Sequence, residues 1–215
     1  LLRRHELLKP GPDLPAGHAE RRRRDDPGYG PVRRACGALF ARPAVGAAAW
    51  KSELMKENGK YRILFVCLGN ICRSPAAHGI MEAFAARGGD AVEVDSAGTY
   101  GGHRGELPDG RMRRAAARRG YELTHRARQI REEDFERFDR IVVMDDMNYE
   151  AVHRLAPSRV HAEKIERMRD YCPRSGRSYV PDPYYEGHEG FELVLDMLEE
   201  GCANLLGAIR SRSRS

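Results

Sequence analysis

The chain has 215 residues and a formal charge of +5, a length typical of one domain with additional chain or of two small domains. No stretch reaches about 18 apolar residues, so no membrane helix is predicted. Five cysteines are too few for a disulfide scaffold, and their odd number favours free thiols in a reducing, cytoplasmic location.

The excess positive charge is confined to the first quarter of the chain. Residues 1–54 hold 11 Lys and Arg against 6 Asp and Glu, whereas residues 55–215 hold 26 of each kind. The neutral bulk of the chain is not typical of a nucleic-acid-binding protein. Residues 1–54 also carry Pro-Gly steps, the run Arg21–Arg24 and little aliphatic periodicity, so we expect a disordered basic tail that is dispensable for folding.

Residues 55–215 are predicted to form a single domain in which strands and helices alternate. A short apolar run indicates a first strand, and Ser74 followed by Pro75 is typical of a helix start. The pattern predicts strands over 61–66, 91–96, 140–144 and 159–165, and helices over 75–87, 108–119, 131–138, 147–155 and 189–209. This alternation favours an α/β fold with three layers, a parallel sheet flanked by helices on both faces.

The candidate site is the segment that joins the first strand to the first helix. It begins at Cys67, contains Gly69 and Asn70, which tolerate positive φ, and ends at Arg73 and Ser74. Ligands of open parallel sheets bind beyond the carboxyl ends of the strands, and a helix N-terminus favours an anion there. The loop N–H groups and the Arg73 guanidinium could therefore hold the oxygens of a tetrahedral oxyanion. The same positive field and the Ser74 hydroxyl favour a thiolate at Cys67, a nucleophile suited to attack on phosphorus.

The sequence from Val66 to Pro75 resembles the signature of the low-molecular-weight protein tyrosine phosphatases. The resemblance extends through segments 95–99, 125–130, 144–145 and 182–185 and covers residues 58–209. It implies a four-stranded parallel sheet and a metal-independent phosphotyrosine hydrolase that works through a phosphocysteine intermediate. In this resemblance Cys67 is the nucleophile, Arg73 binds the phosphoryl group, and Asp182 is the general acid and base.

The resemblance also implies roles for residues around the loop. Leu68, Gly69, Asn70, Ile71, Cys72 and Ser74 form the phosphate-binding loop, while Ser96 and His125 support it. Cys72 would form a protective disulfide with Cys67 under oxidation, or it is a packing residue. Tyr184 and Tyr185 would line the substrate pocket. The family often has an aromatic residue at the position of Gly102, so either Tyr100 replaces it or the pocket is open there.

Several alternatives remain open at this point. Asp145 either holds a loop arginine or caps the next helix. The nearest rival functions are an arsenate reductase, a protein arginine phosphatase of the same fold, and a non-catalytic phosphotyrosine-binding module. No Cys-x2-Cys pair or His/Cys group has zinc spacing, so no metal and no cofactor are predicted. The expected partners are a phosphotyrosine protein and a tyrosine kinase, with no nucleic acid or membrane, and the chain is expected to be a monomer or weak dimer.

Overall fold

The structure is a computed structural model that describes residues 59–213. The predicted tail over residues 1–54 lies outside the described residues. Along the described chain the order of strands and helices is β1 (Tyr61–Cys67), α1 (Arg73–Gly88), β2 (Val92–Gly98), α2 (Gly110–Arg118), α3 (Glu133–Arg137), β3 (Arg140–Val143), α4 (Asp146–Leu155), α5 (Arg159–Ala162), β4 (Ile165–Arg167) and α6 (His188–Ser213). Three short 3-10 turns lie between β4 and α6.

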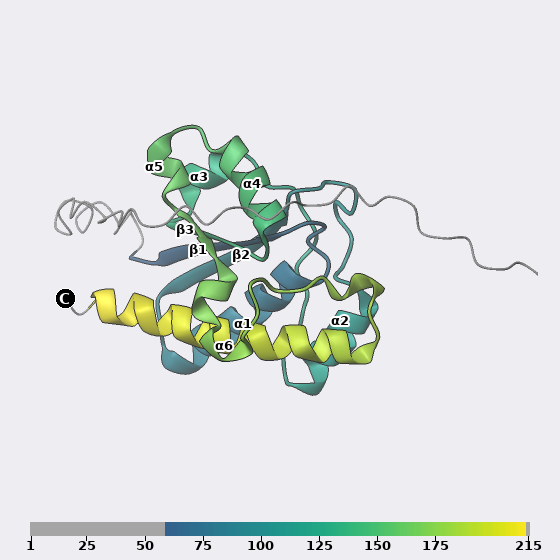
Figure 1. The fold of residues 1–215 in the computed structure, drawn as a ribbon. Coiled ribbons are helices and arrows are strands. Elements are labelled where there is room, and N and C mark those ends of the chain that lie inside the picture. Colours follow the sequence, from purple (N-terminus) through teal and green to yellow (C-terminus); the bar gives the residue numbers. More distant parts are fainter. Residues whose placement is uncertain (1–58, 214–215) are drawn as a thin grey trace, which may run out of the picture. The chain divides into compact units, whose positions relative to one another are not determined.

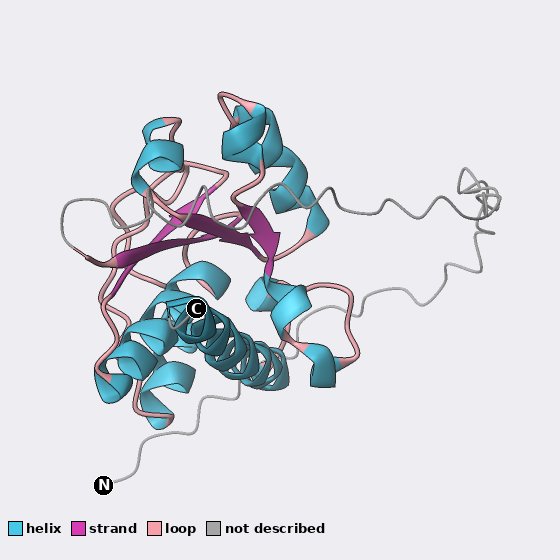
Figure 2. Cartoon of the chain, turned by 90° about the vertical axis from the view of Figure 1, so that its left-hand side faces the viewer, coloured by secondary structure: helices cyan, strands magenta, loops and turns pink. Residues whose placement is uncertain are grey.

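The four strands form one parallel sheet in the order β2-β1-β3-β4. Helices α1, α2 and α6 cover one face, and α3, α4 and α5 lie on the other, as Figures 1 and 2 show. The predicted three-layer α/β fold is confirmed. Within the described residues, none of the helices combines the length and apolar character that a membrane crossing requires.

Strand β1 lies between β2 and β3 in the sheet, and both of its faces are buried. Ile63, Phe65 and Cys67 pack into the larger core cluster on the side of α1 and α6, whereas Leu64 and Val66 pack into the cluster on the opposite face. This period-2 division explains why the strand sequence is continuously apolar. Burial on both faces fixes the position of the strand end, and with it the position of Cys67.

The predicted fourth strand over 159–165 is wrong. Residues Arg159–Ala162 form helix α5, and only Ile165–Arg167 pair with β3. The Ser158 side chain accepts a hydrogen bond from the His161 N–H and so starts a helical turn, which leaves Val160 exposed. The alternating residue pattern of this segment resembles a strand, but its apolar member does not face the core.

The predicted helix start at Ser74 also needs correction. Helix α1 begins at Arg73 with Cys72 as its N-cap residue, and no side chain caps it. The Ser74 hydroxyl instead lies 3.2 Å from the carbonyl oxygen of Ala97 and 3.1 Å from the Cys67 sulfur. The predicted end of the helix is confirmed, because Gly89 adopts a left-handed conformation with φ 68°.

Candidate active site

Cys67 is the last residue of β1 and is almost fully buried. The backbone N–H of Asn70 donates to its sulfur at 3.3 Å, and the Ser74 hydroxyl lies 3.1 Å from the same atom. Helix α1, 16 residues long, begins one residue before Ser74, so its free N–H groups and the positive end of its dipole face this region. A backbone N–H and a hydroxyl group thus lie against a sulfur placed where an anion is favoured.

Asn70 holds the loop in shape. Its φ of 55° is the one positive φ among the described non-glycine residues. Its side-chain amide donates to the Ser74 and Ser96 hydroxyls, each at 2.9 Å, and its side-chain oxygen accepts from the Arg128 N–H at 2.9 Å. The side chain therefore joins the loop to β2 and to the segment before α3, which offsets the cost of the left-handed backbone.

The end of β2 lies directly against the loop. Gly98 pairs with Cys67, and the N–H groups of Thr99 and Tyr100 donate to the carbonyls of Cys67 and Leu68, each at 2.9 Å. A Cβ atom at Gly98 would lie 2.6 Å from the Leu68 carbonyl oxygen, so this position needs glycine. The loop backbone is thus fixed on two sides.

Arg73 is buried, with 3% of its side chain exposed, and carboxylates flank it. Its Nη1 donates to Asp145 Oδ2 at 2.6 Å and to the Val180 carbonyl at 3.3 Å, and its Nη2 donates to Asp182 Oδ2 at 2.6 Å. Burial by itself lowers the pKa of Arg73, but Cys67, Asp182 and Asp145 raise it above its usual value. The guanidinium stays charged next to Cys67.

Asp145 fulfils both of its predicted alternatives. One carboxylate oxygen accepts from Arg73, and the other accepts from the Asn148 N–H at 2.7 Å as the N-cap of α4. The residue comes after β3 at the same sheet edge at which β1 ends in Cys67. One side chain thus connects the start of α4 to the arginine of the loop.

Asp182 lies at the accessible side of Arg73. Its side chain is 40% exposed, and its Oδ1 accepts from the Tyr184 N–H at 3.2 Å. The rings of Tyr184 and Tyr185 pack edge to face with centroids 5.0 Å apart, but Tyr185 is 95% exposed. Tyr184 also contacts the Arg111 guanidinium, 5.3 Å from its ring centroid.

Tyr100 occupies the space beside Gly102. A Cβ atom at Gly102 would lie only 2.2 Å from the Tyr100 ring, which shows that this ring covers the glycine. The ring is exposed and packs edge to face against His103, whose side chain in turn lies over Gly69 of the loop. Tyr100 is thus the aromatic side chain that lies next to the position of Gly102.

His125, which is predicted to support the loop, lies beside Asp95 and Ser96 of β2. Among the hydrogen bonds of the described residues, none joins its ring to Asn70 or Ser74. Its Nδ1 instead lies 3.6 Å from Asp95 Oδ1, and its ring lies 5.0 Å from that of His78. Burial and the nearby His78 lower the pKa of His125 below its usual value. The loop contacts of Arg128 and Val180, which sequence reasoning missed, involve backbone atoms and leave no residue-type signal.

Cys72 lies beside the loop as a free, buried thiol. Burial, with Asp109 and Cys67 nearby, raises its pKa far above the usual range. Cys172 and Cys202 are also free and buried, in the core next to α6. A disulfide between Cys67 and Cys72 therefore stays a prediction for the oxidised protein.

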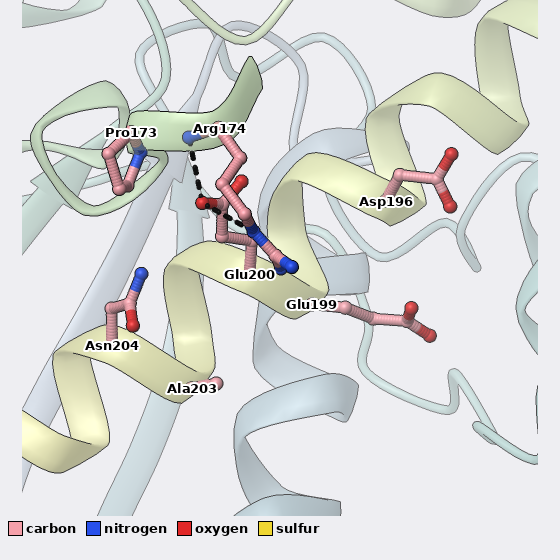
Figure 3. A pocket seen from close by; sticks show the side chains of 7 residues that line it. All are labelled: Pro173, Arg174, Asp196, Glu199, Glu200, Ala203 and Asn204. Carbon is pink, nitrogen blue, oxygen red and sulfur yellow. Dashed lines mark hydrogen bonds and ion pairs between the residues drawn. The ribbon is translucent and has the colours of Figure 1, made fainter.

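A separate surface hollow of about 590 Å³ lies between the segment after β4 and helix α6 (Figure 3). It has an acidic wall, and Arg174 donates to Glu200 within it. Its lining residues are Pro173, Arg174, Asp196, Glu199, Glu200, Ala203 and Asn204. None of these belongs to the loop at Cys67, so the hollow is not part of the candidate site.

Known proteins are similar to this chain over most of its described residues. The sequence model described as low molecular weight phosphotyrosine protein phosphatase matches residues 62–215. A low molecular weight protein-tyrosine-phosphatase of Streptomyces coelicolor is 45% identical over 156 residues, which cover 71% of this chain and 95% of the relative.

Solved structures give the same result. A protein tyrosine phosphatase from Entamoeba histolytica aligns with a TM-score of 0.69 at 40% identity, covering 71% of this chain and 98% of the other. YfkJ from Bacillus subtilis aligns with a TM-score of 0.67 at 37% identity, covering 72% and 98%. Since sequence, fold and extent agree, the chain belongs to the low molecular weight phosphotyrosine protein phosphatase family.

Proposed function

We propose that the tyrosine phosphatase activity of this enzyme is performed by the loop over residues 67–74, with Cys67 as the nucleophile. The observation that carries this proposal is the convergence of the Asn70 N–H, the Ser74 hydroxyl and the charged Arg73 around one buried sulfur. The Cys67 thiolate attacks phosphorus, the S–P bond forms, and the P–O bond to the leaving group breaks.

Asp182 supplies and then retrieves the proton. Its carboxyl group donates a proton to the departing phenolate oxygen, so the product leaves as a neutral phenol. The resulting carboxylate takes a proton from the water that attacks the phosphocysteine, and the S–P bond breaks to release phosphate. Its partial exposure and its contact with Arg73 support this role, because the proton donor has to reach both the leaving group and water.

Arg73 is held in a way that leaves one edge for the phosphoryl group. Its Nη1 is fixed by Asp145 and by the Val180 carbonyl. Its Nε is buried without a hydrogen-bond partner in the described part of the chain, and its Nη2 donates to the partly exposed carboxylate of Asp182. Nε and Nη2 form the fork that binds two oxygens of a phosphoryl group, and this binding strengthens as charge develops in the transition state.

The surroundings of the loop favour an aromatic leaving group. Leu68, Tyr100 and Tyr184 are large apolar side chains that are exposed around or beside the loop. Such side chains form flat contacts with a phenyl ring, while the loop holds the phosphorus deeper. We infer that the substrates are phosphotyrosine proteins of the cytoplasm, that a tyrosine kinase produces them, and that the enzyme acts as a monomer or weak dimer.

The test is an assay of the full chain on an aryl phosphate and a phosphotyrosine peptide in EDTA, beside Cys67→Ser and the control Cys172→Ser. We expect hydrolysis of both substrates by the wild type and the control, and none by Cys67→Ser. Hydrolysis of phosphoarginine peptides alone would instead assign a protein arginine phosphatase. Arsenate reduction without hydrolysis would assign a reductase, and binding of the phosphopeptide without turnover would assign a binding module.

A further inference from the structure

A cluster of two histidines and one aspartate lies behind the loop, outside the residues that the proposed reaction uses. His78 comes from α1, Asp95 from β2 and His125 from the segment between α2 and α3. One donor atom from each of the three side chains lies within 4.8 Å of the other two. The fold thus brings together three metal-ligand side chains that are far apart in the sequence.

Two ring nitrogens of this cluster are buried without a partner. His78 is only 9% exposed, and its Nδ1 makes no hydrogen bond within the described residues; the same is true of His125 Nε2. Buried polar atoms are nearly always paired in native proteins, so two such atoms in adjacent rings require an explanation. A bound cation that accepts their lone pairs provides one.

One ring nitrogen beside the cluster meets a carboxylate, as in known metal centres. Histidine ligands almost always give their second ring nitrogen to a carboxylate, and His78 Nε2 lies 3.1 Å from Glu82 Oε1. Arg128 donates to Asp95 Oδ2 at 2.9 and 3.1 Å. Oδ1 accepts from the Ser96 N–H at 2.7 Å and is the carboxylate oxygen nearest to His125.

We propose that His78, Asp95 and His125 bind a divalent transition-metal ion, with Zn²⁺ as the best-suited ion. Imidazole nitrogen and carboxylate oxygen are ligands that Zn²⁺ takes at about 2.0–2.2 Å. Two donors on one tetrahedral ion are then about 3.4 Å apart. The ligand atoms of the cluster lie within 4.8 Å of one another, so the side chains have to move inward by up to about 1.4 Å to close on the ion.

The experiment uses Zn²⁺ and the untagged full chain carrying Cys67→Ser, so that the active-site thiol takes no metal. After removal of metal with EDTA and desalting, calorimetric titration should show a site that the added variant His78→Gln weakens by at least about tenfold. His161→Gln is the matched control, because His161 is a similarly buried histidine that pairs with Glu136 instead. This control should leave the titration unchanged.

A second measurement does not depend on the folding of the histidine variants. Histidine ring signals in the NMR spectrum of the Cys67→Ser chain should shift for His78 and His125 on addition of Zn²⁺, and those of His161 should not. Unchanged His78 and His125 signals at saturating Zn²⁺ would overturn the proposal. So would a titration that is identical with and without His78→Gln in folded protein, because the metal would then bind elsewhere on the chain.

Discussion

Asp182 occupies part of the anion-binding edge of Arg73, with its Oδ2 2.6 Å from Nη2. The general acid of the proposed reaction thus lies where a phosphoryl oxygen would bind, and substrate has to displace it. This arrangement keeps the guanidinium oriented between turnovers. It also means that one carboxylate opposes anion binding and yet supports the chemistry, and these two effects can be separated by experiment.

The first prediction concerns the removal of that carboxylate. We expect Asp182→Asn to lower kcat for aryl phosphates by about 10²–10⁴-fold, because no proton reaches the leaving oxygen. Inorganic phosphate should at the same time inhibit more strongly, since a negative charge has left Arg73. Steady-state kinetics with phosphate as inhibitor measure both quantities. An unchanged kcat would remove Asp182 from the mechanism, and weaker inhibition by phosphate would contradict the proposed competition for Arg73.

The second prediction separates the two roles of Asp145. Asparagine is as good an N-cap as aspartate, so Asp145→Asn should keep the cap of α4 while it weakens the hold on Arg73. We expect a loss of about 10²-fold in kcat/KM from the misplaced guanidinium. Asp145→Ala should show the same kinetic loss and, in addition, lose about 1 kcal/mol of stability with the cap. Equal thermal stability of the two variants would show that the contact with Asn148 does not stabilise α4.

The third prediction concerns the left-handed backbone at Asn70. Asn70→Ala should destabilise the protein by about 1–2 kcal/mol, because alanine disfavours the φ of 55° at this position. The loss of the hydrogen bonds to Ser74 and Ser96 should destabilise it further. Glycine tolerates the backbone but also lacks the hydrogen bonds. We therefore expect Asn70→Gly to melt above Asn70→Ala, while both lose kcat/KM. Thermal denaturation and kinetics on one aryl phosphate test this order, and a reversed melting order would contradict the strain argument.

The sequence alone was sufficient to predict the part of the site that is contiguous in the chain. Cys67, Asn70 and Arg73 lie in one strand–loop–helix segment, so local residue types already indicated an anion-binding loop. Asp182 could be assigned only by resemblance, since Asp-Pro is also a common turn. No sequence pattern indicated the carbonyl of Val180, because every residue has a backbone carbonyl group.

The remaining differences also have physical causes. The segment at Val160 alternates like a strand, but a serine cap places it in a helix. His78, Asp95 and His125 have no regular spacing, and only the packing of three separate segments brings them together. Metal-ligand motifs read from spacing detect sites built on one hairpin or helix, so a site assembled by tertiary structure escapes them.

The last prediction concerns selective alkylation of the cysteines. Burial, with Glu200 nearby, raises the pKa of Cys172 to about 12, and burial also raises the pKa of Cys202 and Cys72. A thiol whose pKa is raised carries little thiolate at neutral pH and gains it only as the pH approaches that pKa. At pH 7 we therefore expect iodoacetamide to label Cys67 well before these three, and inorganic phosphate to slow that labelling. Peptide mapping by mass spectrometry gives the rates, and Cys67→Ser serves as the control. Labelling of Cys172 or Cys202 as fast as that of Cys67 would contradict the raised pKa values on which this prediction rests.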